Sequence, residues 1–367
     1  MKKVILFIDS LGSGGAQRQV ANVAVLLKKQ GYDVQVLVYR EELFFKPLLD
    51  ENNVPIVLIQ AKKPLERIYK IRRYLNRSGC RAVIAFLETP CFIACLSRIG
   101  HRKWRLITTE RSAMRHTFTS RRNRFFNLFE RFADAKIGNS QNAMELWKTY
   151  YPQYNDKYGV IYNYVSVPEA FSQCEHDYLS CGRLRVTVAA SYQALKNPIA
   201  VVEALHSMTE EQRAGIVIDW YGSKKVAGGS TEIYDKVEAL VKEYGLSDSM
   251  HLHEQTNEIY QKMAQSDAVG LFSTVEGLPN AICEAMTIGR PIIMSRVSDY
   301  DVLVGDNGVL CDPHSVESIR DALAELLSKS REELADMGVR SSQKAAALFS
   351  AETITRQWMD VIEGKEA

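Results

Sequence analysis

The feature of this sequence that most constrains its fold is a regular alternation of short apolar runs with longer amphipathic segments. The first run, Lys2 to Asp9, is followed by a glycine-rich turn and by a segment, Gln17 to Gln30, whose apolar residues recur at helical spacing. Such an alternation is typical of a parallel sheet with helices on both faces. Further strands are expected in the first half at 33–39, 54–59, 82–87, 105–110 and 135–140.

The same alternation begins again near residue 184. Strands are expected at 184–191, 215–222, 250–254, 268–273, 291–295 and 308–312, with helices such as Glu232 to Tyr244 and Glu258 to Gln265 between them. A chain of 367 residues is too long for one ordinary core and suits two domains. We predict two doubly wound, Rossmann-like domains, residues 1–166 and 167–348, with a cleft between them. Ligands of such sheets lie beyond the carboxyl ends of the strands.

The two halves differ in the sign of their charge. Of the 46 Lys and Arg and the 44 Asp and Glu of the chain, residues 1–165 contain 28 and 13, a net +15, and residues 166–367 contain the other 18 and 31, a net −13. This asymmetry indicates two domains with different partners, and an anionic partner for the basic half.

Signals for export and for disulfides are weak. The first apolar run ends at Asp9 after five residues, whereas a signal peptide has roughly 7–15 and a membrane span roughly 18–20. The seven cysteines form no CxxC pair, and no His or Cys cluster accompanies Cys91 and Cys95. We expect a cytoplasmic protein with reduced thiols, soluble or peripheral on the inner face of the membrane.

The strongest motif is EGLPNAICE, from Glu276 to Glu284. It follows an apolar run, turns through Gly277 and Pro279 and enters a helix near Asn280. A helix start presents backbone N–H groups that suit phosphate and hydroxyl oxygens. Two carboxylates at different depths can accept hydrogen bonds from different rings of a polyhydroxylated ligand. On spacing alone, a capping carboxylate and a solvated helix glutamate remain the alternative.

This motif, with the string EAMTIGRPII that begins at Glu284, resembles the signature of family 4 glycosyltransferases, which are retaining enzymes of the GT-B fold. The resemblance implies that Glu276 contacts hydroxyls of the donor sugar, helped by backbone N–H groups around Gly277 and Leu278, and that Glu284 binds the ribose of the nucleotide. The other donor-binding candidates near these strand ends are Pro279, Asn280 and Glu254. Looser matches extend over nearly the whole chain, and the last implies a helix at 349–367 that packs back on the first domain.

A glycine-rich turn, Ser10 to Val20, follows the first expected strand. Gly14 and Gly15 let the backbone approach a phosphate at a helix start. The string GSGG does not satisfy the GxGxxG pattern of dinucleotide sites, and no acidic residue ends the second strand to hold an NAD ribose. The turn resembles the GGA-(Glu/Gln)-R turn of family 4, which implies that it faces the donor diphosphate. A plain strand-to-helix turn is the alternative.

A third segment, Val188 to Pro198, follows the first strand of the second half. The family usually reads G-R-x-x-x-x-K here, and both basic residues bind the phosphates. Lys196 matches and is a compact cation suited to a diphosphate, but Ser191 stands at the Arg position and carries no charge. Residues that might replace this charge are Arg18, Lys224 and Lys225. A surface lysine is the alternative for Lys196.

The segment Arg105 to His116 contains Glu110 and Arg111 where many family members have a His. Its string resembles a subgroup that builds bacterial surface polysaccharides, often from N-acetylhexosamine donors. This implies that Glu110 orients the acceptor hydroxyl and that Arg111 lies near the diphosphate. An internal ion pair between the two side chains is the alternative, and His116 is a weaker candidate.

Two basic stretches of the first half lie beside apolar residues. The first contains Lys62, Lys63, Arg67, Lys70, Arg72, Arg73, Arg77 and Arg81; the second contains Arg115, Arg121, Arg122, Arg124 and Arg131, with Phe118, Phe125, Phe126, Leu128 and Phe129. This composition is typical of an interfacial helix on an anionic membrane, where each charge contributes about 1 kcal/mol. A solvated face over core-packed phenylalanines is the alternative. No nucleic-acid-binding motif accompanies the charges, so nucleic acid is not an expected partner.

We therefore predict a retaining, metal-independent glycosyltransferase. It would move a sugar from a UDP-N-acetylhexosamine or UDP-hexose to a hydroxyl of a glycan or lipid-linked glycan in bacterial surface-polysaccharide synthesis. No cofactor besides the donor is expected, because Lys196 and helix N-termini would stabilise the departing diphosphate. Ser191 favours one alternative, a non-catalytic nucleotide-sugar-binding partner of a transferase. The remaining alternatives are a GT-B-fold epimerase, which the Glu-x7-Glu turn disfavours, and a nicotinamide oxidoreductase, which the missing GxGxxG disfavours.

Overall fold

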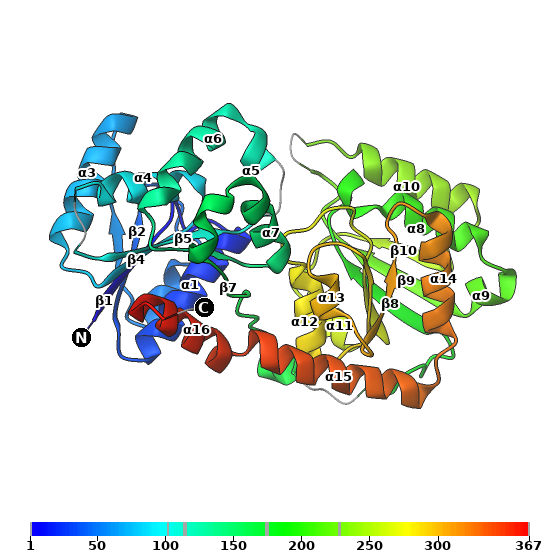
Figure 1. Cartoon of the computed structure of the whole chain (residues 1–367). Helices are drawn as coiled ribbons and strands as arrows, with labels where there is room; N and C mark the ends of the chain where they lie inside the picture. Colours follow the sequence, from blue (N-terminus) through cyan, green and yellow to red (C-terminus); the bar gives the residue numbers. More distant parts are fainter. Residues whose placement is uncertain (1, 101–102, 113–115, 173–175, 227–228, 366–367) are drawn as a thin grey trace. The chain divides into compact units, whose positions relative to one another are not determined.

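The chain divides into two compact units, each with its own parallel sheet (Figure 1). The computed structural model describes residues 2–100, 103–112, 116–172, 176–226 and 229–365. The N-terminal unit consists of Met1–Tyr164 and Ser350–Ala367, and the C-terminal unit of Val165–Phe349. The prediction of two parallel-sheet α/β domains is confirmed.

The N-terminal unit has a seven-stranded sheet in the order β3-β2-β1-β4-β5-β6-β7, and all its strand pairs are parallel. Its strands are β1 Lys3–Phe7, β2 Asp33–Val38, β3 Ile56–Leu58, β4 Ala82–Ala85, β5 Arg105–Glu110, β6 Ala135–Gly138 and β7 Tyr158–Val160. Its helices are α1 Gly15–Lys29, α2 Lys46–Glu51, α3 Pro64–Arg77, α4 Glu88–Arg98, α5 His116–Thr119, α6 Arg121–Asn127, α7 Gln141–Tyr150 and α16 Ala351–Glu363, with the 3-10 helices η1 Leu128–Phe132 and η2 Pro152–Lys157.

Helices cover both faces of this sheet. Alternate strand residues such as Ile5 and Phe7 pack with Ile71 of α3 and Ile93 of α4 in one core cluster. In Figure 1, α1 and α16 lie on the opposite side of the sheet from α3 and α4. The chain therefore returns to the N-terminal unit at its end, where the Arg105 Nε–H donates to Val361 O over 2.8 Å.

The C-terminal unit has a six-stranded sheet in the order β10-β9-β8-β11-β12-β13, also with parallel pairs. Its strands are β8 Leu184–Ala189, β9 Ile216–Tyr221, β10 Met250–His253, β11 Ala268–Leu271, β12 Ile292–Ser295 and β13 Gly308–Cys311. Its helices are α8 Pro198–Ser207, α9 Glu210–Ala214, α10 Glu232–Glu243, α11 Ile259–Ala264, α12 Asn280–Ile288, α13 Tyr300–Leu303, α14 Val316–Leu327 and α15 Arg331–Phe349, with η3 Glu169–Phe171 and η4 Ala194–Lys196.

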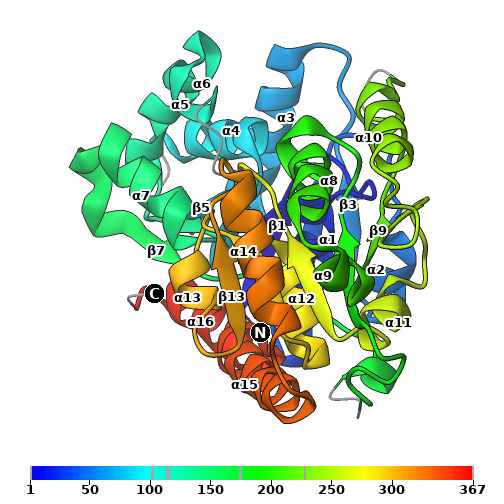
Figure 2. The ribbon, with the colours of Figure 1, turned by 90° about the vertical axis from the view of Figure 1, so that its right-hand side faces the viewer.

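The core of this unit lies between the sheet and α8, α10 and α14. Trp220 and Ile218 of β9 pack there with residues such as Val201 of α8 and Leu323 of α14. On the other face, α12 packs along α15, as both Figure 1 and Figure 2 show. Among the described residues, no helix is long and apolar enough to cross a bilayer.

The order of the strands reverses direction between β1 and β4 in the first sheet and between β8 and β11 in the second. In open parallel sheets, ligands bind beyond the carboxyl ends of the strands at such a reversal. The loops that follow β8 and β11 contain the expected donor-binding residues, so the topology places those loops side by side.

Two elements were not expected from the sequence. Strand β7 follows the helical region at 141–157, and its three residues are too few to show a strand period. Helix α15 has 19 residues and precedes α16, whereas a single terminal helix was expected. Ser350 separates the two helices because its hydroxyl accepts the Thr353 N–H and so caps a new helix.

A buried polar cluster lies under the end of β5. Glu130 accepts hydrogen bonds from Lys136 Nζ over 2.9 Å and from Thr108 Oγ1 over 2.5 Å. Lys136 Nζ also lies 3.9 Å from the centroid of the Trp147 ring. Burial alone would lower the pKa of Lys136, but the charges of Glu130 and Glu110 and the hydrogen bond to Glu130 together raise it. Lys136 is therefore protonated at neutral pH inside the core.

The turns after β8 and β9 approach each other closely at Gly222. A Cβ at this glycine would lie 1.9 Å from Ala190 O, which also accepts a hydrogen bond from Trp220 Nε1 over 2.7 Å. Any side chain at position 222 would therefore displace the backbone just before Ser191.

We expect Glu130→Ala to lower the free energy of unfolding by about 3–5 kcal/mol, because it leaves the Lys136 charge buried without its partner. The matched control is Glu145→Ala, which removes the exposed Glu145–Lys148 pair and should cost less than about 1 kcal/mol. Urea unfolding followed by tryptophan fluorescence measures both, because Trp104, Trp147 and Trp358 lie in the N-terminal unit. Equal losses for the two variants would contradict the structural role of the buried pair.

We expect Gly222→Ala to destabilise the C-terminal unit by about 1–3 kcal/mol through overpacking against Ala190 O. In the control Gly305→Ala, the nearest atom to the new Cβ is Lys344 Nζ at 3.4 Å, the end of a flexible side chain. Its effect should stay within about 0.5 kcal/mol. Scanning calorimetry measures both variants, and an unchanged transition for Gly222→Ala would show that the two turns separate freely.

Candidate functional site

The loops after β8 and β11 meet through an ion pair. Lys196 Nζ lies 2.5 Å from Glu276 Oε1, and Ser273 Oγ donates to the same oxygen over 2.7 Å. The Lys196 side chain is 21% exposed and that of Glu276 13%, so both are partly shielded from water yet open to a ligand. The structure thus brings together the two residues that the motifs singled out separately.

The backbone also joins these two loops. The Thr274 N–H donates to Leu195 O over 2.8 Å. Strands β8 and β11 are neighbours in the sheet, so their carboxyl ends lie at the same edge. Lys196 and Glu276 are therefore held in place by the strand order, although 80 residues separate them in sequence.

The turn from Glu276 into α12 has the shape expected from its sequence. Gly277 O accepts a hydrogen bond from Ser298 Oγ, the Leu278 side chain is buried, and Pro279 precedes the first helical residue, Asn280. Glu284 lies one turn inside the helix, where its Oε1 accepts a hydrogen bond from Tyr260 OH over 3.4 Å. The first backbone N–H groups of a helix have no intrahelical acceptor and can bind anionic oxygens.

The position that usually holds an arginine is occupied by an uncharged hydroxyl in a polar turn. Ser191 Oγ accepts a hydrogen bond from Gln193 Nε2 over 2.9 Å. Of the residues considered as substitutes for that charge, Lys224 has its ammonium 4.3 Å from the centroid of the Tyr234 ring, and Lys225 is exposed. Glu254 is exposed just beyond the end of β10.

In the N-terminal unit, the glycine-rich turn leads directly into α1. Gly14 is the residue before the helix, with extended backbone angles, and both Gly14 and Gly15 are exposed. A Cβ at Gly15 would have no atom within 4 Å. The backbone at this helix start is therefore accessible to a ligand.

Glu110, at the end of β5, holds its own loop. Its Oε1 accepts hydrogen bonds from the backbone N–H groups of Arg111 and Ser112, each over 3.0 Å, and its Oε2 accepts one from Trp147 Nε1 over 3.0 Å. The sequence motif identified the residue but did not reveal these contacts. Trp147 was not among the candidate residues named from the sequence.

The guanidinium of Arg111 packs beside two aromatic rings. Its Cζ lies 4.8 Å from the centroid of Phe86 and 5.8 Å from that of Trp358 on α16. Its Nη1 donates to Asn163 Oδ1 over 3.2 Å, whereas Nε and Nη2 are buried and have no hydrogen-bond partner among the described residues. Burial lowers the pKa of Arg111 to about 10, against the opposing effect of Glu110.

Gln19 is a structural residue that the sequence analysis missed. Its Nε2 donates to Tyr164 O and its Oε1 accepts the Tyr164 N–H, both over 3.0 Å. A glutamine inside the helix that follows the glycine-rich turn carried no distinct signal, because its partner is the backbone 145 residues away.

The basic side chains of the first stretch do not all face solvent. On α3, Arg73 and Arg77 are exposed, beside Leu65 and Tyr69, which are 80% and 63% exposed. The guanidinium of Arg72, in contrast, donates to backbone carbonyls of α4 and the residue after it. The guanidinium of Arg72 therefore binds the protein backbone and does not add a free charge to this surface.

The second basic stretch contains both core-packed phenylalanines and exposed apolar residues, so each of the two alternatives considered for it applies in part. Phe118 is buried, and Phe126 stacks on Phe92 with ring centroids 4.0 Å apart. Phe125 and Leu128 are 53% and 56% exposed. Of the other residues named in this region, Arg115 and the side chain of His116 lie outside the described part of the structure.

Two family models match this chain. "Glycosyl transferases group 1" matches residues 182–344, and "Glycosyltransferase Family 4" matches residues 13–167. The first match spans the loops that hold Lys196 and Glu276, and the second includes Gly14 and Gly15 and the end of β5.

Curated relatives match over most or all of the chain. The N-acetylgalactosamine-N,N'-diacetylbacillosaminyl-diphospho-undecaprenol 4-alpha-N-acetylgalactosaminyltransferase of Campylobacter jejuni is 22% identical over 89% of this chain and 90% of its own length. The amylovoran biosynthesis glycosyltransferase AmsD of Erwinia amylovora is 22% identical over 99% of this chain and 100% of its own length.

A solved structure, that of Anabaena HepE in complex with UDP, has a TM-score of 0.80 at 18% identity and covers 99% of this chain and 100% of that one. At this identity the likeness shows the fold. With both halves matched by glycosyltransferase models, this chain belongs to the family 4 type of glycosyltransferases, with the two parallel-sheet α/β domains of the GT-B fold.

Proposed function

We propose that this glycosyltransferase moves a hexose or an N-acetylhexosamine from a UDP-sugar to a hydroxyl of a glycan or lipid-linked glycan, in the synthesis of a bacterial surface polysaccharide. The observation that carries the proposal is the Lys196–Glu276 pair at the strand reversal of the C-terminal unit. The Campylobacter relative is named for a diphospho-undecaprenol substrate, and the Anabaena structure contains UDP.

In the proposed donor complex, the C-terminal unit holds the nucleotide sugar. The diphosphate takes the place of Glu276 as the partner of Lys196, and the backbone N–H groups at the start of α12 add hydrogen bonds. Glu276 is then free to accept hydrogen bonds from sugar hydroxyls, and Glu284 does the same for the ribose. Gly14 and Gly15 of the N-terminal unit are proposed to contact the diphosphate as well.

The proposed reaction retains the anomeric configuration. The bond between the anomeric carbon and the diphosphate oxygen breaks while a new bond forms to the acceptor oxygen on the same face, and the acceptor proton passes to the departing phosphate. Lys196 stabilises the negative charge that develops on the leaving group. Glu110 and Arg111 act on the acceptor side by holding the loop after β5, since the Glu110 carboxylate already bonds that loop.

We also propose that this reaction needs no metal ion. From the sequence we expected no Asp-x-Asp string after a strand, but one stands at Asp299 to Asp301, shortly after β12 Ile292–Ser295. Asp299 is buried where α13 begins, and Asp301 is exposed. Carboxylates in such different surroundings do not suit a shared metal–diphosphate site.

The acceptor is proposed to reach the N-terminal unit at a membrane surface. The exposed Arg73 and Arg77 lie on the same helix as the exposed Leu65 and Tyr69, so α3 presents both charge and apolar area. Basic and apolar groups together are what binds a helix to an anionic bilayer interface.

Lys196→Ala and Glu276→Gln should each lower kcat for sugar transfer by about 10²–10³-fold, the usual cost of removing one group that stabilises transition-state charge. The matched control is Lys242→Ala, which breaks the exposed Lys242–Glu238 pair of the same unit and should leave the rate unchanged. Thermal-shift titration with UDP-, GDP- and ADP-sugars identifies the donor, because only a bound donor raises Tm. Transfer is then measured with radiolabelled donor and membrane lipid extract.

Full activity in both variants would refute the assignment of the site. A wild-type chain that binds a UDP-sugar but transfers nothing to any acceptor would instead support a non-catalytic partner. Ser191→Arg adds a further test, since a charge at this position should tighten donor binding if Ser191 faces the diphosphate.

The triple variant Lys70→Glu, Arg73→Glu, Arg77→Glu should lose most of its binding to vesicles that contain phosphatidylglycerol. At about 1 kcal/mol for each charge near an anionic surface, the loss is at least about fivefold for each residue, because each substitution removes a positive charge and adds a negative one. Vesicle sedimentation measures it, with pure phosphatidylcholine vesicles and the variant Lys236→Glu, Lys242→Glu, Lys262→Glu as controls. Equal binding by the two triple variants would exclude α3 as the docking surface.

A further inference from the structure

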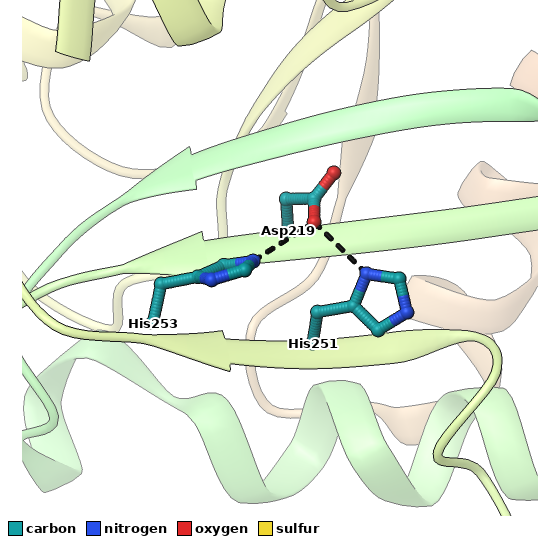
Figure 3. A group of neighbouring side chains, drawn as sticks. All are labelled: Asp219, His251 and His253. Carbon is teal, nitrogen blue, oxygen red and sulfur yellow. Dashed lines mark hydrogen bonds and ion pairs between the residues drawn. The ribbon is translucent and has the colours of Figure 1, made fainter. Parts of the chain in front are cut away.

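Three metal-ligating side chains converge on the outer edge of the C-terminal sheet (Figure 3). Asp219 lies on β9, and His251 and His253 lie on β10, the outermost strand. His251 is in register with Asp219. Side chains two residues apart in a strand point to the same face, so both imidazoles lie on the face that carries the carboxylate.

The three donor atoms are close enough to share one ion. Nδ1 of His251 and Nε2 of His253 each lie 3.0 Å from the same oxygen of Asp219, Oδ1, and the three atoms all lie within 4.8 Å of one another. In a tetrahedral zinc site with bonds of about 2.0–2.2 Å, the ligand atoms are about 3.3–3.5 Å apart. Only small movements of the two rings separate the observed cluster from that geometry.

The surroundings hold the ligands in place. The Asp219 side chain is 9% exposed, and the His253 ring stacks on Tyr221 with centroids 4.3 Å apart. On each imidazole, the proton can lie on the ring nitrogen that does not face Asp219. The ring then binds a metal ion as a neutral ligand through the nitrogen that does.

One charge opposes a cation here. Arg185 Nε lies 3.7 Å from Asp219 Oδ2. Both imidazoles approach Oδ1 of Asp219, whereas Arg185 approaches Oδ2. Arg185 therefore orients the carboxylate and leaves Oδ1 directed at the rings. Its positive charge lowers the affinity for a metal ion without blocking the position.

We propose that Asp219, His251 and His253 bind one Zn²⁺ ion through one oxygen and two imidazole nitrogens. Two imidazoles and a single carboxylate suit Zn²⁺, Ni²⁺ or Cu²⁺, whereas Mg²⁺ and Ca²⁺ require more oxygen ligands. The imidazoles are 40% and 37% exposed, so the fourth position is open to water.

The ion would join the edge strand β10 to β9 and stabilise the C-terminal unit. Its ligands lie within β9 and β10, on elements other than the loops that contain Lys196 and Glu276. The proposal therefore stands apart from the sugar-transfer reaction, and zinc binding is measured without donor or acceptor.

The test is isothermal titration of the full-length, tag-free, chelator-treated protein with ZnSO₄, with Co²⁺ absorption as a report on coordination. One ion should bind per chain, and Zn²⁺ at about ten times its Kd should raise Tm by a few degrees. Asp219→Asn, His251→Gln and His253→Gln should each weaken binding at least about tenfold. The control His314→Gln removes an exposed histidine of the same unit and should bind as the wild type does.

The site would be refuted if all four variants still bound one ion per chain. It would also be refuted if the wild type showed no heat of binding and no cobalt spectrum. Circular dichroism confirms that each variant is folded. If Asp219→Asn unfolds, the two histidine variants decide the question alone, because their side chains are partly exposed and their loss leaves no buried charge unpaired.

Discussion

Parallel backbone pairing is the constraint on which the rest of this protein depends. Parallel strands must be joined by crossovers, and the crossovers return every strand with its carboxyl end at the same edge of the sheet. In the C-terminal unit this places the loops after β8 and β11 side by side, and in the N-terminal unit it places the glycine-rich turn at the edge that also ends β5. Each site residue takes its position from the order of the strands.

Each unit contains an ion pair, and the two pairs differ in how deeply they are buried. In the N-terminal unit, the Glu130–Lys136 pair and Trp147 lie beneath the loop that Glu110 holds. This network links the end of β5, with the backbone N–H groups of Arg111 and Ser112, to the core. In the C-terminal unit, the Lys196–Glu276 pair is partly exposed. A ligand can therefore separate the pair at a much lower desolvation cost than a buried pair would impose.

Family membership and local geometry answer different questions about this chain. The matches to both halves establish a glycosyltransferase of the GT-B fold. The contacts of Ser191 and Arg111 come from the geometry alone. The geometry shows that Arg111 packs beside Phe86 and Trp358, so α16 contributes directly to the surroundings of a residue that motif comparison assigned to substrate.

The sequence by itself determined the two-domain α/β class, most strand positions and the motif from Glu276 to Glu284, because periodicity and turn residues act over a few neighbouring positions. Only the tertiary structure showed the Lys196–Glu276 pair, the contacts of Glu110 with Trp147, and the cluster of Asp219 with His251 and His253. Each of these joins residues that strand order, not local pattern, brings together. No spacing rule encodes such contacts, because the partners are separated by whole crossovers.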